Sequence, residues 1–155
     1  TNKSKELTNL NEMAEKSLNI IEDSITYKNI KIIKNFNSRS DIKTYMNEVT
    51  QVILTLLQNA EDILLEKQTQ NPYIKINTFE DDEYLYLQVI DNGGGIPQDI
   101  LDKIFDPYFS TKHEKNGSGL GLYFAKSIIE NNCDALLTVE NNQDEAVFTI
   151  RFKKE

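Results

Sequence analysis

Two glycine-rich segments of unlike spacing constrain this 155-residue chain more than any other feature. The first, Asp91–Pro97, reads DNGGGIP, and the second, Gly117–Leu122, reads GSGLGL. Because glycine has no Cβ, such segments let backbone N–H groups approach an anion closely and allow positive φ angles. The first follows a strand-like stretch and the second opens a helix-like stretch, which are usual places for ligand-binding loops. The two segments therefore predict a pocket for a nucleotide.

A long amphipathic helix is predicted upstream of both segments, from an N-cap at Asn47 to about Glu66. Winding the sequence at 100° per residue separates an apolar arc from a polar one. The apolar arc contains Val49, Val52, Ile53, Leu56, Leu57, Ala60, Ile63 and Leu64, and the polar arc contains Glu48, Gln51, Thr55, Asn59 and Asp62. A polar arc is commonly plain solvated surface, but the glycine segments downstream favour a functional role for this one.

The remaining periodicity predicts both helices and strands, without internal repeats. A first helix is expected over Asn9–Ile25, where Asn9 and Glu12 resemble a capping box. Strands are expected at residues 30–36, 42–45, 73–79, 84–90, 136–140 and 145–152; the two strands at 73–90 and the two at 136–152 are expected to pair as antiparallel hairpins. A short helix is expected at residues 97–104 and a longer one at residues 119–131, with a loop over residues 105–116 between them.

The composition limits the class of protein. A chain of this length with 39% hydrophobic residues suits one domain, 1–155, with a real core. Its net charge of −8 would repel a nucleic acid backbone, so nucleic acid is not an expected partner. Cys133 is the only cysteine, which fits a reducing, cytoplasmic setting. No apolar run approaches the roughly 20 residues needed to span a bilayer. Since the chain begins at Thr1, we expect a soluble segment of a longer protein, whose other parts are compatible with anchoring in an inner membrane.

Three residue types carry the chemistry of the expected pocket. Asp91, at the end of an apolar strand, is expected to be partly buried and to need a donor such as the amino group of adenine. Gly93 and Gly95 would let the backbone lie against the flat base. Asn59 supplies a neutral oxygen of the kind that suits Mg²⁺. Leu122 stands where a dinucleotide fingerprint has its last glycine, and no Lys-Ser/Thr pair follows to make a P-loop, so those two nucleotide folds are disfavoured.

The combined pattern resembles a known family. LLQNAED around Asn59 resembles the N box, DNGGG from Asp91 the G1 box, IFDPYFSTK around Phe105 the F box, and GSGLGL from Gly117 the G2 box. Four such boxes occur in the same order and spacing in the catalytic ATP-binding domain of bacterial sensor histidine kinases. These kinases belong to a superfamily that also includes gyrase, Hsp90 and MutL. The resemblance covers residues 8–152.

This resemblance implies an α/β fold of the Bergerat type, a two-layer sandwich whose mixed, mostly antiparallel sheet is covered on one face by helices. Its ligands would be ATP and Mg²⁺, with Asn59 as catalytic residue and metal ligand and Lys112 as a second catalytic residue at the phosphates. Residues 105–117 would form an ATP lid. The implied nucleotide-binding residues are Asn59, Asp62, Asp91, Gly93, Gly95, Ile96, Phe105, Thr111, Lys112, Gly117, Ser118, Gly119, Leu120, Gly121 and Leu122.

The resemblance also implies partners outside this chain. The γ-phosphate would pass to a histidine on the protein's own dimerisation domain, absent here, and then to an aspartate of a response-regulator receiver domain. Residues 1–8 would be the linker from that domain, and no direct membrane contact is expected. His113, the only histidine, lies in the lid, so it is a weak candidate for the acceptor.

Three alternatives stay open at this stage. Thr55 stands one turn before Asn59, where the ATP-hydrolysing relatives of the gyrase, Hsp90 and MutL type have a catalytic Glu, and this argues against a hydrolase. A serine kinase of the kind that controls sigma factors would share the same boxes. A nucleotide-sensing interaction module without kinase activity would also keep them.

Overall fold

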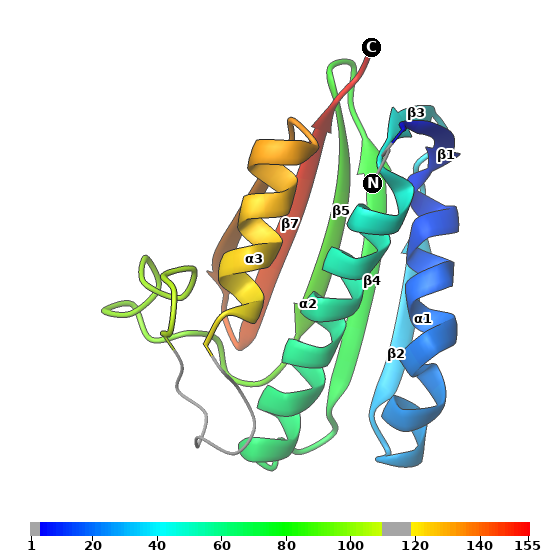
Figure 1. Ribbon diagram of the computed structural model, residues 1–155. Coiled ribbons are helices and arrows are strands. Elements are labelled where there is room, and N and C mark those ends of the chain that lie inside the picture. The colour runs from blue at the N-terminus through cyan, green and yellow to red at the C-terminus, as the bar shows by residue number, and fades with distance from the viewer. Residues whose placement is uncertain (1–3, 110–118) are drawn as a thin grey trace.

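Five strands form one sheet in the computed structural model, which describes residues 4–109 and 119–155 (Figure 1). Across the sheet their order is β2 (Lys31–Phe36), β4 (Tyr73–Glu80), β5 (Tyr84–Asp91), β7 (Glu145–Lys153) and β6 (Leu136–Asn142). β2 and β4 run parallel, and the other three pairs run antiparallel. Both predicted hairpins, β4–β5 and β6–β7, are confirmed.

One face of this sheet is covered by the helices α1 (Leu10–Tyr27), α2 (Met46–Glu66) and α3 (Gly121–Ser127), the last of which continues as a π-helical turn, η2 (Ile128–Asn132) (Figure 1). The core lies between the two layers. Its largest fully buried side chains include Leu18 and Leu10 of α1, Ile53 and Leu57 of α2, and Phe152 of β7. This confirms the predicted two-layer sandwich with a mixed, mostly antiparallel sheet.

A second, two-stranded sheet closes one end of the helical layer. It pairs β1 (Glu6–Asn9) with β3 (Asp41–Thr44) in antiparallel register. The strand at β3 is predicted from the sequence, whereas β1 falls largely within residues 1–8, for which only a linker is expected. Four residues with one buried side chain, Thr8, give too short a pattern to predict a strand.

The two long helices begin differently from one another. Asn9 caps α1 as predicted, since its Oδ1 accepts a hydrogen bond of 2.9 Å from the backbone N–H of Glu12. The predicted cap of α2 at Asn47 is wrong. Its first helical residue is Met46, and Tyr45 occupies the cap position without a side-chain hydrogen bond. Asn47 therefore lies in the first turn, exposed to solvent.

The predicted short helix at residues 97–104 is also wrong. The chain forms successive turns there, in which N–H groups donate to carbonyls three residues back, as from Ile100 to Pro97 at 3.1 Å and from Lys103 to Ile100 at 2.9 Å. Buried Ile104 attaches these turns to the core. The next helix begins at Gly121, two residues later than predicted, because Gly119 has φ of +75°, outside the helical region.

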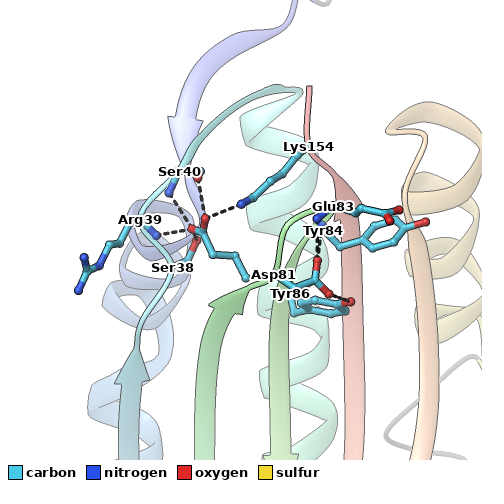
Figure 2. Close-up of polar contacts among 9 residues, drawn as sticks. Ser38, Arg39, Ser40, Asp81, Glu83, Tyr84, Tyr86 and Lys154 are labelled. Carbon is cyan, nitrogen blue, oxygen red and sulfur yellow. Dashed lines mark hydrogen bonds and ion pairs between the residues drawn. The ribbon is translucent and has the colours of Figure 1, made fainter.

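A single carboxylate joins three remote segments at one end of the sheet. Glu80, the last residue of β4, accepts hydrogen bonds from the backbone N–H groups of Arg39 at 2.6 Å and Ser40 at 2.9 Å. Its other oxygen accepts from the Ser40 hydroxyl at 2.8 Å and pairs with Lys154 Nζ at 2.7 Å (Figure 2). The connection between β2 and β3 and the residue that follows β7 are therefore both tied to β4.

Replacing Glu80 with Gln is expected to lower the free energy of unfolding by about 1–3 kcal/mol, because a charged acceptor of several donors is lost. Lys154 and then the two backbone N–H groups hold the pKa of Glu80 well below its usual value of 4.5. The stabilisation is therefore present above pH 4.5 and is lost as the pH falls through the lower pKa of the folded state. Thermal melts of both proteins between pH 3 and 7 measure this difference.

The matched control is Glu83→Gln, which removes an exposed carboxylate in the neighbouring turn. A stability difference for Glu80→Gln that is no larger than the control's at neutral pH would contradict the proposed importance of this carboxylate.

Candidate functional site

Asp91 forms the floor of the candidate site. It ends β5 in the middle of the sheet, between Ile74 of β4 and Ala146 of β7, and only 3% of its surface is exposed. Its Oδ1 accepts a hydrogen bond of 2.9 Å from the backbone N–H of Gly93. Burial raises the pKa of Asp91 to about 6, although the Gly93 N–H and the positive charge of Lys67 oppose this change. A carboxylate that is so poorly solvated favours a ligand that donates a hydrogen bond.

The backbone after Asp91 needs glycines for two separate reasons. Gly94 and Gly95 have φ of +93° and +78°, a region that side-chain-bearing residues rarely adopt. Gly93 has an ordinary φ, but a Cβ there would lie 2.8 Å from Ile63 Cγ2 and 2.9 Å from Asp91 Oδ1. The first glycine segment therefore lies directly against the last turns of α2, which carry Ile63.

Several polar side chains, one of them within the segment, hold it in place. Asn92 accepts from the Tyr73 N–H at 2.8 Å and donates to the Asn71 carbonyl at 3.0 Å. Lys67, just after α2, donates to the carbonyl of Gly95 at 3.3 Å. Asn141 of β6 bonds both backbone groups of Ile96, accepting from its N–H at 2.8 Å and donating to its carbonyl at 2.7 Å. A segment with three glycines is thereby held in one conformation.

α2 connects the two glycine segments. A Cβ at Gly121, the first residue of α3, would lie 3.6 Å from Thr55 Cγ2, whereas Gly93 faces Ile63. Thr55, Asn59 and Ile63 follow one another at intervals of four residues, so they share one stripe of the helix, about 12 Å long. Asn59 therefore lies midway between the first glycine segment and the start of α3, half-buried, with half-buried Asp62 one turn further along.

Residues on both sides of the undescribed part of the predicted lid contact one another. The backbone N–H of Tyr108 donates to the carbonyl of Gly119 at 2.8 Å. The ring of Phe105 packs edge-on against Phe148 of β7 at 6.1 Å between centroids, and Lys126 of α3 lies 4.8 Å from the Phe105 ring centre. Of the predicted site residues, Thr111, Lys112, Gly117 and Ser118 lie outside the described residues.

Some residues near the site differ from the sequence prediction. The sequence pattern predicts that Leu120, Leu122, Phe124 and Ile128 anchor the last helical segment in the core. Leu122 and Ile128 are partly buried against the core, but Phe124 is 52% exposed. Ala125 and Ile129 are buried in its place. In α2, Leu54 and Glu61 are also buried, and Glu61 accepts from Ser24 at 3.0 Å and pairs with Lys28 at 3.1 Å. The supports at Lys67, Asn92 and Asn141 were not predicted, because contacts between a polar side chain and remote backbone groups leave no periodic signal in the sequence.

The donor set constrains a metal site. Within residues 4–109 and 119–155, no three His, Cys, Asp or Glu side chains gather as they would around a fully protein-bound ion. Mg²⁺ commonly takes one or two protein oxygens and completes its shell with phosphates and water, which suits a lone amide oxygen such as that of Asn59.

No helix in the described part of the chain is long and apolar enough to cross a membrane.

Comparisons with known proteins agree with this geometry. The family model for histidine kinase-, DNA gyrase B- and HSP90-like ATPases matches residues 45–155. The two-component sensor PprA of Pseudomonas aeruginosa is 34% identical over 73% of this chain and 12% of its own length. Sporulation kinase A of Bacillus subtilis is 28% identical over 97% of this chain and 24% of its own length. The chain thus spans less than a third of these relatives.

Solved structures show the same likeness. The catalytic domain of histidine kinase ThkA superposes with a TM-score of 0.84 at 28% identity, covering 97% of this chain and 95% of that one. ThkA in complex with the response regulator protein TrrA superposes with a TM-score of 0.79 at 26% identity, covering 97% of this chain and 42% of that one.

The burial of Asp91 predicts how the free energy of unfolding depends on pH. Between its ordinary pKa of 3.8 and its raised pKa of about 6, Asp91 binds more protons in the folded than in the unfolded state, so stability falls as the pH rises through this window. Asp91→Asn removes this loss and keeps an acceptor for Gly93. We expect the nucleotide-free variant to be more stable above about pH 6 by up to about 3 kcal/mol, and this gain to vanish near pH 4.

Urea unfolding at pH 4, 6 and 8 measures this gain, with Asp82→Asn, an exposed aspartate in a turn, as the control. Equal stability of wild type and Asp91→Asn at pH 8 would contradict a desolvated carboxylate at this position.

The conformation of Gly119 in the second glycine segment predicts the effect of a side chain on stability. A Cβ at Gly119 would lie 2.5 Å from the Tyr108 carbonyl carbon, and its φ is +75°, so Gly119→Ala is expected to lower the free energy of unfolding by about 2 kcal/mol or more. Gly121→Ala is the matched control, because its Cβ would meet only Thr55 at an ordinary 3.6 Å and alanine suits a helix. Similar melting temperatures for the two variants would refute the predicted clash.

Proposed function

The chain belongs to the histidine kinase-, DNA gyrase B- and HSP90-like ATPase family, and we propose that it serves as the ATP-binding catalytic domain of a sensor histidine kinase. The observation that carries this proposal is the stripe Thr55, Asn59, Ile63 on α2, with the floor at Asp91 and Gly93 near one end and Gly121 near the other. A nucleotide that lies along this stripe would have its base at the first glycine segment and its phosphates toward the second.

The base end of the site fits adenine. Asp91 is buried, carries a raised pKa and has one oxygen bonded to Gly93, so a second donor is needed to compensate its desolvation. The 6-amino group of adenine is such a donor. Gly93 and Gly95 keep the backbone beside this carboxylate free of side chains, and Ile96 packs against the core next to them.

The phosphate end of the site requires positioning more than covalent chemistry. Asn59 would hold Mg²⁺, which neutralises charge on the phosphates when bound. Gly119, Leu120 and Gly121, with Lys112 and the other predicted residues of the lid, would hold the phosphate chain. In the transfer itself, the bond between the γ-phosphorus and ADP breaks as a bond to an imidazole nitrogen forms. The acceptor histidine would lie on a separate dimerisation domain of the parent protein.

Structural relatives support the proposed partners. ThkA has been solved in complex with the response regulator protein TrrA, and several similar proteins are named as sensor kinases. We therefore propose a response-regulator receiver domain as the final phosphate acceptor. We also propose that this domain lies in the cytoplasm and that another part of the parent protein anchors it in the inner membrane.

An ATP hydrolase is a poorer fit for this site. Such an enzyme needs a carboxylate beside Asn59 to activate water, whereas Thr55 stands one turn away and its hydroxyl donates to the Gln51 carbonyl at 3.0 Å. Glu48, two turns further from Asn59 than Thr55 is, lies 3.4 Å from the side-chain nitrogen of Asn132 in η2. A serine kinase would be distinguished by the acid-stable phosphoserine that it leaves on its substrate.

The nucleotide site is tested by calorimetric titration of a nonhydrolysable ATP analogue with and without Mg²⁺. The wild type is expected to bind, and Asp91→Asn to bind at least about tenfold more weakly, because a hydrogen bond to a buried charge is lost. Failure of the wild type to bind would refute the catalytic proposal and leave a nucleotide-independent interaction module.

The metal role is tested with Asn59→Ala. Its affinity is expected to match that of the wild type without Mg²⁺ and to fall short by about tenfold with Mg²⁺, since only the metal-dependent part of binding is lost. Gln58→Ala, an exposed neighbour on α2, is the control. The same loss with and without Mg²⁺ would contradict a metal ligand at Asn59.

A further inference from the structure

Asn141 pairs with the first glycine segment as a neighbouring strand would. It lies in β6 at the edge of the sheet, 45 residues away in sequence from its partner. Its Oδ1 accepts from the Ile96 N–H at 2.8 Å, and its Nδ2 donates to the Ile96 carbonyl at 2.7 Å. One amide side chain therefore satisfies both backbone groups of one residue, which fixes the position and the orientation of that residue.

This pairing is close enough to affect the glycine beside it. A Cβ at Gly95 would lie 3.0 Å from Asn141 Oδ1, and φ at Gly95 is +78°. A side chain at Gly95 would therefore strain the backbone and would also force Asn141 to shift. The next residue back, Gly94, also has a positive φ and donates to the carbonyl of Asp144 in the turn after β6 at 2.9 Å.

The hairpin of β6 and β7 therefore supports the far end of the glycine segment, while Asp91 and Asn92 support its near end. Consecutive glycines lose much conformational freedom when they are ordered, and a contact that orders them before the ligand arrives lowers the cost of binding. A small shift of Gly93–Ile96 would change the distance between the base and the Asp91 carboxylate, because Gly93 and Asp91 share a hydrogen bond.

From this geometry we propose that Asn141 is a positioning residue for adenine recognition. It acts through Ile96 and Gly95 to hold the backbone wall of the base pocket at the distance at which Asp91 meets the 6-amino group. The inference rests on the proposed function, because it concerns the same nucleotide site. It adds a residue from the sheet edge, outside the four sequence boxes, that determines how well the site distinguishes adenine from other bases.

The test compares wild type, Asn141→Ala and Asn142→Ala in the 155-residue chain. Asn142 is the matched control, since it is the next residue of β6 and its side chain is exposed. Calorimetry measures the affinity for ATP and for purine riboside triphosphate, which lacks the 6-amino group. We expect Asn141→Ala to bind ATP about tenfold more weakly and to discriminate less between the two nucleotides, while Asn142→Ala behaves as wild type.

Two further measurements separate positioning from a general loss of stability. Amide exchange at Ile96 is expected to be faster in Asn141→Ala, and the thermal midpoint shows that the variant is folded at the temperature of the titration. Asn141→Asp keeps the acceptor for the Ile96 N–H but loses the donor to its carbonyl, so an intermediate affinity for ATP is expected.

Each outcome has a definite meaning. Equal ATP affinity of wild type and Asn141→Ala would overturn the inference and leave the proposed function intact. An equal loss for ATP and for purine riboside triphosphate would also overturn it, because Asn141 would then not act through the contact with the amino group. A wild type that binds neither nucleotide would refute the proposed function together with this inference.

Discussion

The packing of α2 against the sheet is the constraint on which the rest of the site depends. Val49, Ile53 and Leu57 of its apolar arc are fully buried in the core, and this sets the rotation of the helix about its own axis. With that rotation fixed, Asn59 must face away from the core, toward the two glycine segments. The same burial that stabilises the fold therefore turns the polar residues of α2 toward the candidate site.

The burial of Asp91 at the centre of the sheet lowers the stability of the fold when its carboxyl is charged. An apolar residue would fill this position more favourably, because the carboxylate loses solvation there and this loss raises its pKa to about 6. Hydrogen bonding to Gly93 offsets this loss only in part. The candidate site therefore keeps a buried carboxylate that a hydrogen-bond donor from a ligand would stabilise.

The supports around the glycine segment show how rigidity is added to residues that lack it. Lys67, Asn92 and Asn141 come from three different parts of the chain, and each bonds to backbone groups rather than to side chains. At the opposite end of the sheet, Glu80 ties backbone N–H groups of a connecting loop to a strand in the same manner. In both places a polar side chain forms the hydrogen bond to a backbone group that has no partner within a helix or a strand pair.

The sequence by itself determined the long helices, the two hairpins and the boxes around Asn59 and Asp91, because periodicity and turn residues are local properties of the chain. It also predicted the fold class, through the order and spacing of those boxes. Only the tertiary structure decided at which residues α2 and α3 begin and which face of the last helix is buried. It alone also brought Asn141 into contact with Ile96. Those outcomes depend on contacts between residues far apart in the chain, and such contacts leave no periodic pattern in the sequence.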